Sequence, residues 1–417
     1  MRARARPGKR AVAGTLRGHG HGHGGRDRRE AMGRAQKRDR AVSQSGVEDG
    51  RYGDVDIESL RKAAGPDYSS VQRNLALELV RVTEAAALEA GRWFGRGDKI
   101  KADNAAVKAM RKVLSVLEVD GVVIIGEGAK DEAPMLFCGE RVGAGYGPEV
   151  DVAVDPLDGT TLVSQGRHGS ISVLSMAERG TLLDCGPCVY MEKIVVGAEV
   201  GPGVVSLDQS LTVNLAALSA RLRKPVTDLT IAILDRPRHE EMFEVCRNAG
   251  TRILAFSDGD VAMSLEAARP DSSVDMMIGI GGSPEGVLSA CALKCMGGFM
   301  QGRFWPRNDE EASLARDLDL NMGIMTVDDM VSGEDVYFAA TGISDGMLNG
   351  VRYWSGGATT NSLVMRSASG TVRTLETHHH WAKPGLTNIS GRAGANGEDY
   401  VAPHFMRMTP PNGNDHF

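Results

Sequence analysis

The stretch Val150–Thr160, VDVAVDPLDGT, decides the fold of this chain. Its apolar first half predicts a buried β-strand, and Pro156 is expected to end that strand because proline cannot continue a hydrogen-bonded ladder. Asp155 is therefore expected at the carboxyl end of a strand, which is where open α/β sheets bind their ligands. This position makes Asp155 a candidate ligand-binding residue.

A second carboxylate follows three residues later. Asp158 comes after a turn containing Pro156 and Gly159, so the two carboxylates can converge on one point. Two anions that close require a cation between them, and hard oxygen ligands without Cys or His favour Mg²⁺ or Mn²⁺ over zinc. If a helix begins at Gly159–Thr160, its free backbone N–H groups offer a place for a phosphate.

Composition limits the classes of protein to which the chain can belong. With 417 residues, 42% apolar and 24% charged, it can form two modest domains or one large one. It contains no run of 18 apolar residues, so no membrane span is predicted. Residues 1–40 hold 13 basic and 3 acidic residues, a net charge of +10, while the rest holds 35 basic and 51 acidic residues, a net charge of −16. So acidic a body is a poor general binder of nucleic acid.

Both ends of the chain lack a periodic apolar pattern. Residues 1–66 are basic and rich in Gly and His and are predicted to be disordered, and residues 384–417 form a low-order tail rich in Gly, Pro and Asn. An inert extension is favoured for 1–66, with targeting, nucleic-acid contact and adventitious metal binding by His19, His21 and His23 as alternatives. Six cysteines in so long a chain do not make a disulfide scaffold, which favours a reducing cytoplasm.

The region between these ends alternates apolar strand patterns with helical ones. Strands are predicted over 121–125, 150–154, 170–176, 189–196, 229–234, 252–256 and 274–280. Helices are predicted over 69–95, 104–117 and 131–137, and from 238, 260 and 284 onward. This order predicts an α/β protein with a parallel or mixed sheet and right-handed crossovers.

Further acidic residues follow the same design as Asp155. Glu127 lies between two glycines directly after the strand 121–125, and Asp103 stands just before the helix 104–117. Asp131 is expected at the start of the short helix 131–137, and Glu285 could complete a metal cluster from a glycine-rich loop. The sequence thus offers several carboxylates at strand or helix ends, where they can surround one metal site.

Three loops after the later strands carry groups suited to a phosphorylated sugar. Arg236 and Arg238 can grip a phosphate, Asp258 and Asp260 could accept hydrogen bonds from sugar hydroxyls, and the glycines before Pro284 open a backbone anion site. The glycine spacing in that last loop departs from the dinucleotide-binding fingerprint and no ribose-binding acid follows, which argues against NAD.

The remaining cysteines and histidines point to no second activity. Cys185 and Cys188 have the spacing of a thioredoxin site, but a strand rather than a helix is expected after them, so an ordinary loop is favoured over a redox site or a regulatory disulfide. Cys291 and Cys295 are expected in the core, and the run 378–380, HHH, on the surface.

Taken together, the motifs from about Tyr68 to about Lys383 resemble class II, or bacterial-type, fructose-1,6-bisphosphatases, relatives of the lithium-sensitive sugar phosphatases. They are GDKIKADNAAV, IGEGAKDEAPML, VDPLDGT, YMEK, RPRH, DGD and GIGGSPEGV. The resemblance implies a layered α-β-α-β-α fold with the active site between two mixed-sheet subdomains. We expect a metal-binding subdomain over 67–226 and a substrate-binding subdomain over 227–383.

The resemblance also implies roles for particular residues. Metal ligands would be Asp103, Glu127, Asp155, Asp158 and Glu285. Asp131 and Thr160 would activate the attacking water. Substrate contacts would fall on Asp158, Gly159, Thr160, Tyr190, Arg236, Pro237, Arg238, Asp258, Gly259, Asp260 and Gly282.

Three positions depart from the family pattern. Asp158 stands where some members have Glu, Arg236 replaces a Lys, and Gly169 stands where Asn is expected. The first change could shift one metal, the second should keep the phosphate contact, and the third leaves the geometry of that loop open.

The expected reaction is metal-dependent hydrolysis of the 1-phosphate of fructose-1,6-bisphosphate, by direct water attack, as in gluconeogenesis. The partner would be a sugar bisphosphate, without nucleic acid or membrane, and the protein would be a cytoplasmic homo-oligomer, a dimer or tetramer. The nearest alternatives keep the chemistry and change the substrate to sedoheptulose-1,7-bisphosphate, an inositol phosphate or a nucleotide 3′-phosphate. A redox regulator using Cys185 and Cys188, or a nucleic-acid binder using residues 1–40, remains as a different class.

Overall fold

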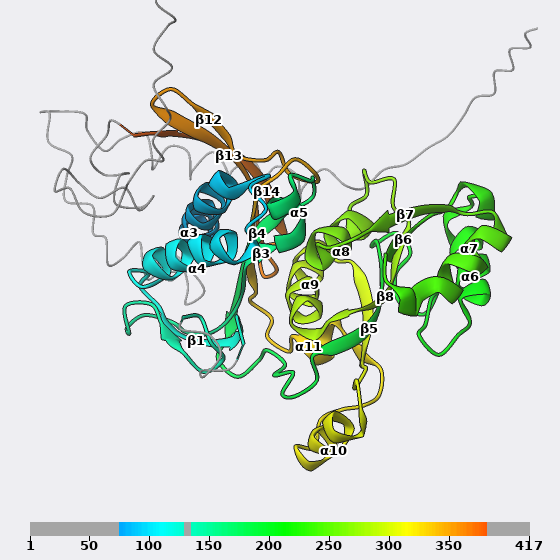
Figure 1. Cartoon of the computed structure of the whole chain (residues 1–417). Coiled ribbons are helices and arrows are strands. Elements are labelled where there is room, and N and C mark those ends of the chain that lie inside the picture. The colour runs from blue at the N-terminus through cyan, green and yellow to red at the C-terminus, as the bar shows by residue number, and fades with distance from the viewer. Residues whose placement is uncertain (1–74, 129–134, 382–417) are drawn as a thin grey trace, which may run out of the picture. The chain divides into compact units, whose positions relative to one another are not determined.

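Two mixed β-sheets form the framework of the computed structural model, which describes residues 75–128 and 135–381 (Figure 1). In these residues the first sheet has the strand order β12-β13-β11-β4-β3-β1-β2, with β14 paired to β13, and the second has the order β10-β9-β5-β8-β6-β7. The strands of the first sheet are β1 (Asp120–Ile125), β2 (Arg141–Val142), β3 (Glu149–Asp158), β4 (Ile171–Glu178), β11 (Tyr337–Gly342), β12 (Arg352–Trp354), β13 (Gly357–Arg366) and β14 (Thr371–His380). Those of the second are β5 (Tyr190–Val196), β6 (Thr230–Leu234), β7 (Arg252–Phe256), β8 (Met276–Gly282), β9 (Phe299–Phe304) and β10 (Met325–Thr326).

Helices lie outside and between the two sheets. They are α3 (Leu75–Ala90), α4 (Lys99–Leu114), α5 (Thr160–Gln165), α6 (Leu211–Leu222), α7 (Glu240–Ala249), α8 (Asp260–Ala268), α9 (Ser283–Met296), α10 (Asp309–Asp317) and α11 (Val327–Met330), with short 3₁₀ turns η1 (Gly91–Trp93), η2 (Val226–Asp228) and η3 (Pro237–His239). Helices α3 and α4 cover the outer face of the first sheet, α6 and α7 the outer face of the second, and α8 and α9 lie between the sheets (Figure 1). The expected layered α-β-α-β-α order is confirmed.

Helix α9 is the centre of the inner layer. It contacts strands of both sheets, and residues from nearly all round its circumference are buried, as expected for a helix that is apolar on every side. Cys291 and Cys295 lie in this core, at 0% and 6% exposure, which confirms their predicted place. Because the first turn of α9 carries Glu285, the tightly packed inner layer fixes one acid of the site.

The chain passes back and forth between the sheets. After β1–β4 it enters the second sheet with β5, and it returns to the first sheet with β11–β14. Each sheet therefore takes strands from both sides of residue 226, where the subdomain boundary was expected. That boundary remains a prediction.

Two local expectations are wrong, and a third lies mostly outside the described residues. Pro156 does not end β3, which continues to Asp158. The helix expected over 104–117 is α4, which begins at Lys99, so Asp103 lies inside the helix and not before it; the Asp98 side chain caps α4 by accepting from the Lys101 N–H at 3.0 Å. The predicted helix 131–137 lies largely outside the described residues, and its described end, 135–137, is not helical.

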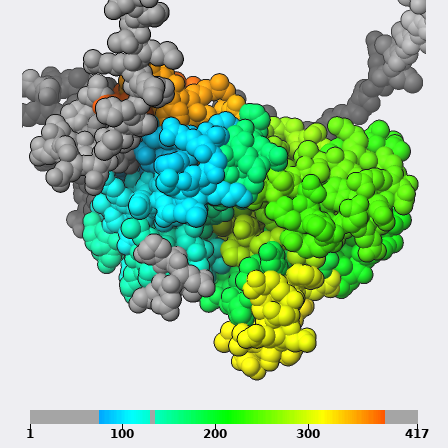
Figure 2. Space-filling view, viewed as in Figure 1, coloured from blue at the N-terminus to red at the C-terminus, as the bar shows by residue number. Residues whose placement is uncertain are grey.

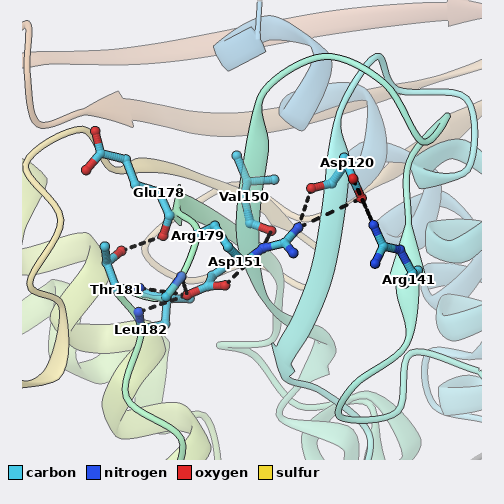
Figure 3. A network of polar contacts seen from close by, with 9 residues as sticks. Asp120, Arg141, Val150, Asp151, Glu178, Arg179, Thr181 and Leu182 are labelled. Carbon is cyan, nitrogen blue, oxygen red and sulfur yellow. Dashed lines mark hydrogen bonds and ion pairs between the residues drawn. The ribbon is translucent and has the colours of Figure 1, made fainter.

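One acid of the stretch 150–160 stabilises the fold and does not line the pocket that holds Asp155 and Asp158. Asp151 of β3 is fully buried, and its Oδ2 accepts hydrogen bonds from the backbone N–H groups of Gly180–Leu182 at 2.7, 2.9 and 3.1 Å (Figure 3). Arg179 donates to the Val150 carbonyl at 3.1 Å and lies 3.5 Å from Asp151 Oδ1. These bonds tie the start of β3 to the turn that follows β4, and so hold the strand that carries Asp155 and Asp158.

Candidate active site

The five acids proposed as metal ligands line one cavity of 270 Å³. Asp103 comes from α4, Glu127 from the loop after β1, Asp155 and Asp158 from the end of β3, and Glu285 from the first turn of α9. Figure 2 shows the surface hollowed between the cyan atoms of the first layers and the yellow-green atoms of the inner one. Side chains 182 positions apart in the sequence thus meet in space, as the metal-site hypothesis requires.

A β-bulge turns both acids of β3 toward this cavity. In a regular strand, residues three apart point to opposite faces. Here Asp155 pairs with Val173 of β4, but Asp158 pairs with Ile171, so one extra residue of β3 is accommodated between them. The Asp155 Oδ1 accepts a hydrogen bond from the Leu157 N–H at 3.0 Å within the bulge. The irregularity is what lets a D-x-x-D spacing place two carboxylates in one pocket.

The cavity destabilises the ionised form of its carboxyl groups and so raises their pKa values. Burial and the neighbouring Asp103 and Glu285 carboxylates raise the pKa of Glu127 to about 8. Burial, followed by Asp158, Glu127 and Glu285, raises the pKa of Asp155 well above its usual value. A bound cation would reverse these shifts by stabilising the ionised carboxylates.

The donor set fits a hard divalent cation. Glu285 Oε2 is buried and has no hydrogen-bond partner among the described residues, so it is available as a ligand. Every candidate ligand is a carboxylate oxygen, the type that Mg²⁺ and Mn²⁺ prefer. Within residues 75–128 and 135–381, no three His, Cys, Asp or Glu side chains already stand in a metal-coordinating arrangement. The pocket gathers candidate ligands, and no coordination geometry is assigned to them.

Helix α5 begins at the mouth of the pocket, as predicted. Gly159 precedes it with φ +90°, a conformation that favours glycine, and Thr160 is its first residue. The Thr160 hydroxyl lines the cavity and donates to the Leu157 carbonyl at 3.2 Å. The next N–H in the helix, that of Thr161, is taken by Asp258 Oδ2 at 3.0 Å, so the first turn offers fewer free donors to a phosphate than expected.

Two aspartates link α5 and the end of β3 to the α8 region, each by accepting a hydrogen bond from the backbone of the other segment. Asp258, from the loop before α8, accepts from Thr161 of α5, while Asp158 Oδ2 accepts from the Ala262 N–H of α8 at 3.1 Å. Asp258 Oδ1 also accepts from the Gly259 N–H at 3.2 Å. Asp258 lines the pocket, but both of its oxygens already have backbone donors, so a sugar hydroxyl would have to share them.

Asp260 has a partner that the sequence did not reveal. The side chain of Lys193 on β5 is fully buried, and its Nζ lies 2.5 Å from Asp260 Oδ2 and 3.1 Å from the Gly282 carbonyl. The Lys193 charge also opposes the rise that burial produces in the pKa of Glu285. Asp260 is therefore occupied by an ion pair, and Lys193 fixes the turn from β8 into α9. No signal other than its place in the YMEK motif could have indicated this role.

The other proposed substrate residues gather at the end of β8. Tyr190 pairs with Gly282 across β5 and β8, and the Arg238 guanidinium lies over the Tyr190 ring at 5.1 Å. Arg238 also donates to the Ile280 carbonyl at 2.6 and 3.2 Å, and Arg236 to the Asp235 carbonyl at 2.8 Å. Pro237, between the two arginines, begins η3. None of these residues lines the 270 Å³ cavity, but Gly282 leads directly into the turn that carries Glu285.

His239, beside these arginines, is structural. Its Nδ1 lies 2.6 Å from the Leu234 carbonyl, and its Nε2 accepts from the Ile280 N–H at 2.8 Å, which makes Nδ1 the protonated nitrogen. Burial lowers its pKa, in keeping with a neutral ring. The ring holds the arginine loop against β8.

The structure also tests predictions about cysteines and histidines that lie outside the pocket. Cys185 and Cys188 are free, buried thiols in a turn closed by a 3.0 Å backbone bond, and strand β5 follows them as predicted. Burial raises the pKa of the Cys185 thiol, the opposite of a reactive redox cysteine. The surface placement of residues 378–380 is wrong for His379, which is 5% exposed and bonded to Thr360. Asp131, proposed to activate water, lies outside the described residues.

A pocket lined by so many acids can bind an anionic phosphate ester only if cations offset the negative charge. The site therefore indicates the class of metal-assisted phosphatases. Comparison with known proteins agrees. The profile of a family described as bacterial fructose-1,6-bisphosphatase, glpX-encoded, matches residues 73–379. The chain belongs to this family of bacterial fructose-1,6-bisphosphatases.

Two curated relatives are similar over most of their length. Fructose-1,6-bisphosphatase class 2 of Haemophilus influenzae (strain ATCC 51907 / DSM 11121 / KW20 / Rd) is 41% identical over 325 residues, which are 74% of this chain and 97% of the relative. Fructose-1,6-bisphosphatase 1 class 2 of Escherichia coli (strain K12) is also 41% identical over 325 residues, with 74% and 96% covered. The resemblance inferred from the motifs is confirmed.

Proposed function

We propose that this enzyme hydrolyses the 1-phosphate of fructose-1,6-bisphosphate, giving fructose 6-phosphate and phosphate, as a step of gluconeogenesis. The observation that supports this most directly is the convergence of five acids and Thr160 on one cavity between the two sheets. Membership of the fructose-1,6-bisphosphatase family supplies the substrate.

In this proposal, Asp103, Glu127, Asp155, Asp158 and Glu285 bind Mg²⁺ or Mn²⁺. When bound, the cations would neutralise the scissile phosphate and lower the pKa of a coordinated water. Asp158 would contribute mainly through Oδ1, because its Oδ2 accepts from Ala262. Glu285 would contribute Oε2, the oxygen without a hydrogen-bond partner in the described structure.

Proton removal from the attacking water is assigned to Thr160 with Asp131. The Thr160 hydroxyl donates to Leu157, which leaves its oxygen free to accept from a water in the cavity. To pass a proton on, this hydroxyl would have to release the Leu157 carbonyl and donate instead to Asp131, which would receive the proton. Attack would be direct, without a phosphoenzyme.

The distal phosphate would bind at the end of β8, on Tyr190, Arg236 and Arg238. The stacking of Arg238 on Tyr190 preorganises two of these groups. Asp258, Gly259 and Gly282 would face the sugar between the two phosphates. Binding energy gained at the distal phosphate would position the scissile one.

A panel of substrates and metals tests this proposal. Phosphate release would be measured for fructose-1,6-bisphosphate, sedoheptulose-1,7-bisphosphate, an inositol monophosphate and a nucleotide 3′-phosphate, each with Mg²⁺, Mn²⁺ or a chelator. We expect rapid release from fructose-1,6-bisphosphate with a metal only. Release that survives chelation, or that favours the inositol or nucleotide substrate, would contradict the proposal. Comparable rates on both sugar bisphosphates would establish the bifunctional alternative.

Other expectations remain proposals about the whole protein. We propose a cytoplasmic homo-oligomer, a dimer or tetramer, with separate subdomains over 67–226 and 227–383. The cytoplasmic location rests on the cysteine pattern, and the oligomeric state and the subdomain division rest on the family resemblance. No helix in the described residues is long and apolar enough to cross a membrane.

A further inference from the structure

Strand β14 carries three metal-ligating side chains on one face. Glu376, His378 and His380 follow one another at intervals of two residues, so in a strand they point to the same side of the sheet. All three are exposed, while His379 between them is buried on the opposite side. None of the three lines the acidic pocket, so this face of β14 is a separate place on the protein.

The distance between the first two groups fits a shared metal ion better than a hydrogen bond. The Nε2 of His378 lies 3.4 Å from Glu376 Oε1, which is longer than a well-formed hydrogen bond. Two ligands bound to Zn²⁺ at about 2.0–2.1 Å in tetrahedral geometry are about 3.3–3.4 Å apart. The pair therefore already stands at the separation that one shared ion requires. Their side chains are 59% and 61% exposed, so an ion and its waters can reach them.

The other nitrogen of His378 has a partner that orients the ring. Its Nδ1 lies 3.1 Å from Oγ1 of Thr359, the residue directly opposite on β13. The same hydroxyl accepts a hydrogen bond from Trp354 Nε1 at 3.3 Å, which fixes its place. When His378 Nδ1–H donates to this hydroxyl, Nε2 presents its lone pair on the side of Glu376. Metal-binding histidines are typically oriented in this way by a hydrogen bond from the second ring nitrogen.

The third group, His380, packs against an aromatic ring. Gly357 of β13 lies between His380 of β14 and Trp354 of β12. Because Gly357 has no side chain, the Trp354 ring crosses it and meets the His380 ring edge-on, with 5.0 Å between the ring centroids. A Cβ at Gly357 would come within 2.2 Å of the Trp354 ring. The described residues hold no ready-made cluster of three such ligands, so His380 completes the site by rotation about its side-chain bonds.

We propose that Glu376, His378 and His380 bind one transition-metal ion such as Zn²⁺, with water in the remaining position. Imidazole nitrogens suit Zn²⁺, Ni²⁺ and Cu²⁺, whereas Mg²⁺ prefers oxygen ligands, so this site selects a different kind of ion from the all-carboxylate pocket. Three protein ligands with one open position are a common arrangement for Zn²⁺. The proposal does not depend on the reaction assigned to the acidic pocket.

Calorimetric titration of the full chain with Zn²⁺ tests the site. Excess Mg²⁺ is present to occupy the acidic pocket. In every protein used, His19, His21 and His23 are replaced by Asn, so that the N-terminal histidines do not bind the probe.

The test variant is His378→Asn with His380→Asn, and the control is His168→Asn, which changes another exposed histidine. We expect one equivalent of Zn²⁺ to bind to the parent and to the control. This equivalent should bind at least about a hundredfold more weakly in the test variant, because loss of two ligands costs more than the roughly 10–100-fold lost with a supporting partner. Both variants change exposed side chains and should leave the circular dichroism unchanged.

A third variant and a second measurement test the orientation and the linkage. Thr359→Val keeps both imidazoles but removes the hydroxyl that faces His378 Nδ1, and it should weaken Zn²⁺ binding about tenfold. Zn²⁺ should also raise the Tm of the control and not that of the test variant, because an ion that binds only the folded chain stabilises it.

Two outcomes would overturn the proposal. Equal Zn²⁺ affinity and stoichiometry in the test variant and in the control would mean an adventitious ion only. Zn²⁺ binding that excess Mg²⁺ abolishes would locate the ion in the acidic pocket. Unchanged affinity in Thr359→Val, with binding still lost in the test variant, would refute the role of the hydroxyl and leave the three ligands in place.

Discussion

Replacing Lys193 with methionine tests whether a buried cation stabilises the turn from β8 into α9. Methionine retains most of the side-chain volume but removes the charge that lies 2.5 Å from Asp260 and 3.1 Å from the Gly282 carbonyl. The Asp260 side chain is only 10% exposed, so its carboxylate would be left nearly buried without a partner.

The expected loss follows from the burial of the pair. Removing one partner of a buried ion pair typically costs about 3–5 kcal/mol. In a large domain each kcal/mol lowers Tm by roughly 2 °C, so Lys193→Met should lower Tm by about 6–10 °C. The measurement is thermal unfolding followed by circular dichroism at neutral pH, with a chelator present so that cation binding does not add to stability.

Lys224→Met is the matched control. Lys224 lies 2.7 Å from Asp275 Oδ2, but its side chain is 33% exposed, and Asp275 keeps a hydrogen bond from the Thr230 N–H at 2.7 Å. The control should cost less than about 1 kcal/mol. A second change, Asp260→Leu, should restore much of the stability lost in Lys193→Met. If Lys193→Met melts within about 2 °C of the control, the buried pair contributes no more than a surface one and the reasoning fails.

Three further variants test the pocket, the distal site and a buried histidine. Asp155→Asn should lower kcat by about a hundredfold or more with unchanged circular dichroism, and near-normal turnover would remove the case for a metal cluster. Arg238→Ala should raise KM for fructose-1,6-bisphosphate far more than for a small phosphate ester, and equal effects would exclude an anchoring role. Burial lowers the pKa of His379 to about 4, so the unfolded chain binds more protons and stability should fall as pH drops from about 6.5 toward 4. This loss should be smaller in His379→Gln, and identical slopes would show that His379 does not cause it.

Apolar runs located β1 and β3–β8, but β2 and β9–β14 were not predicted from them. The strand expected over 150–154 lies within β3, and those expected over 252–256 and 121–125 match β7 and β1 within one residue. Asp155 and Glu127 could be selected because each follows such a run, and Glu285 because it lies in the first turn of a helix, whereas Asp103 lies inside α4. Local pattern therefore predicts where a residue lies along an element.

What the sequence could not supply was the identity of distant partners. Lys193 and Asp260 are 67 residues apart and Asp258 and Thr161 are 97 apart, so no local spacing reveals that these groups bind each other. Asp103 was misplaced because the start of α4 is polar and lacks an apolar period, while the Asp98 cap is visible only in three dimensions. The burial of His379 likewise depends on its pairing with Thr360 on the neighbouring strand.

Pro156 takes on a specific meaning once β3 is known to run through it. A ring nitrogen without hydrogen cannot complete a ladder, so the extra residue between Asp155 and Asp158 cannot anneal into a regular pleat. Such a pleat would rotate one of the two carboxylates to the opposite side of the sheet. Pro156 therefore maintains the bulge, and the orientation of the Asp155 and Asp158 side chains is set in the absence of a bound ion.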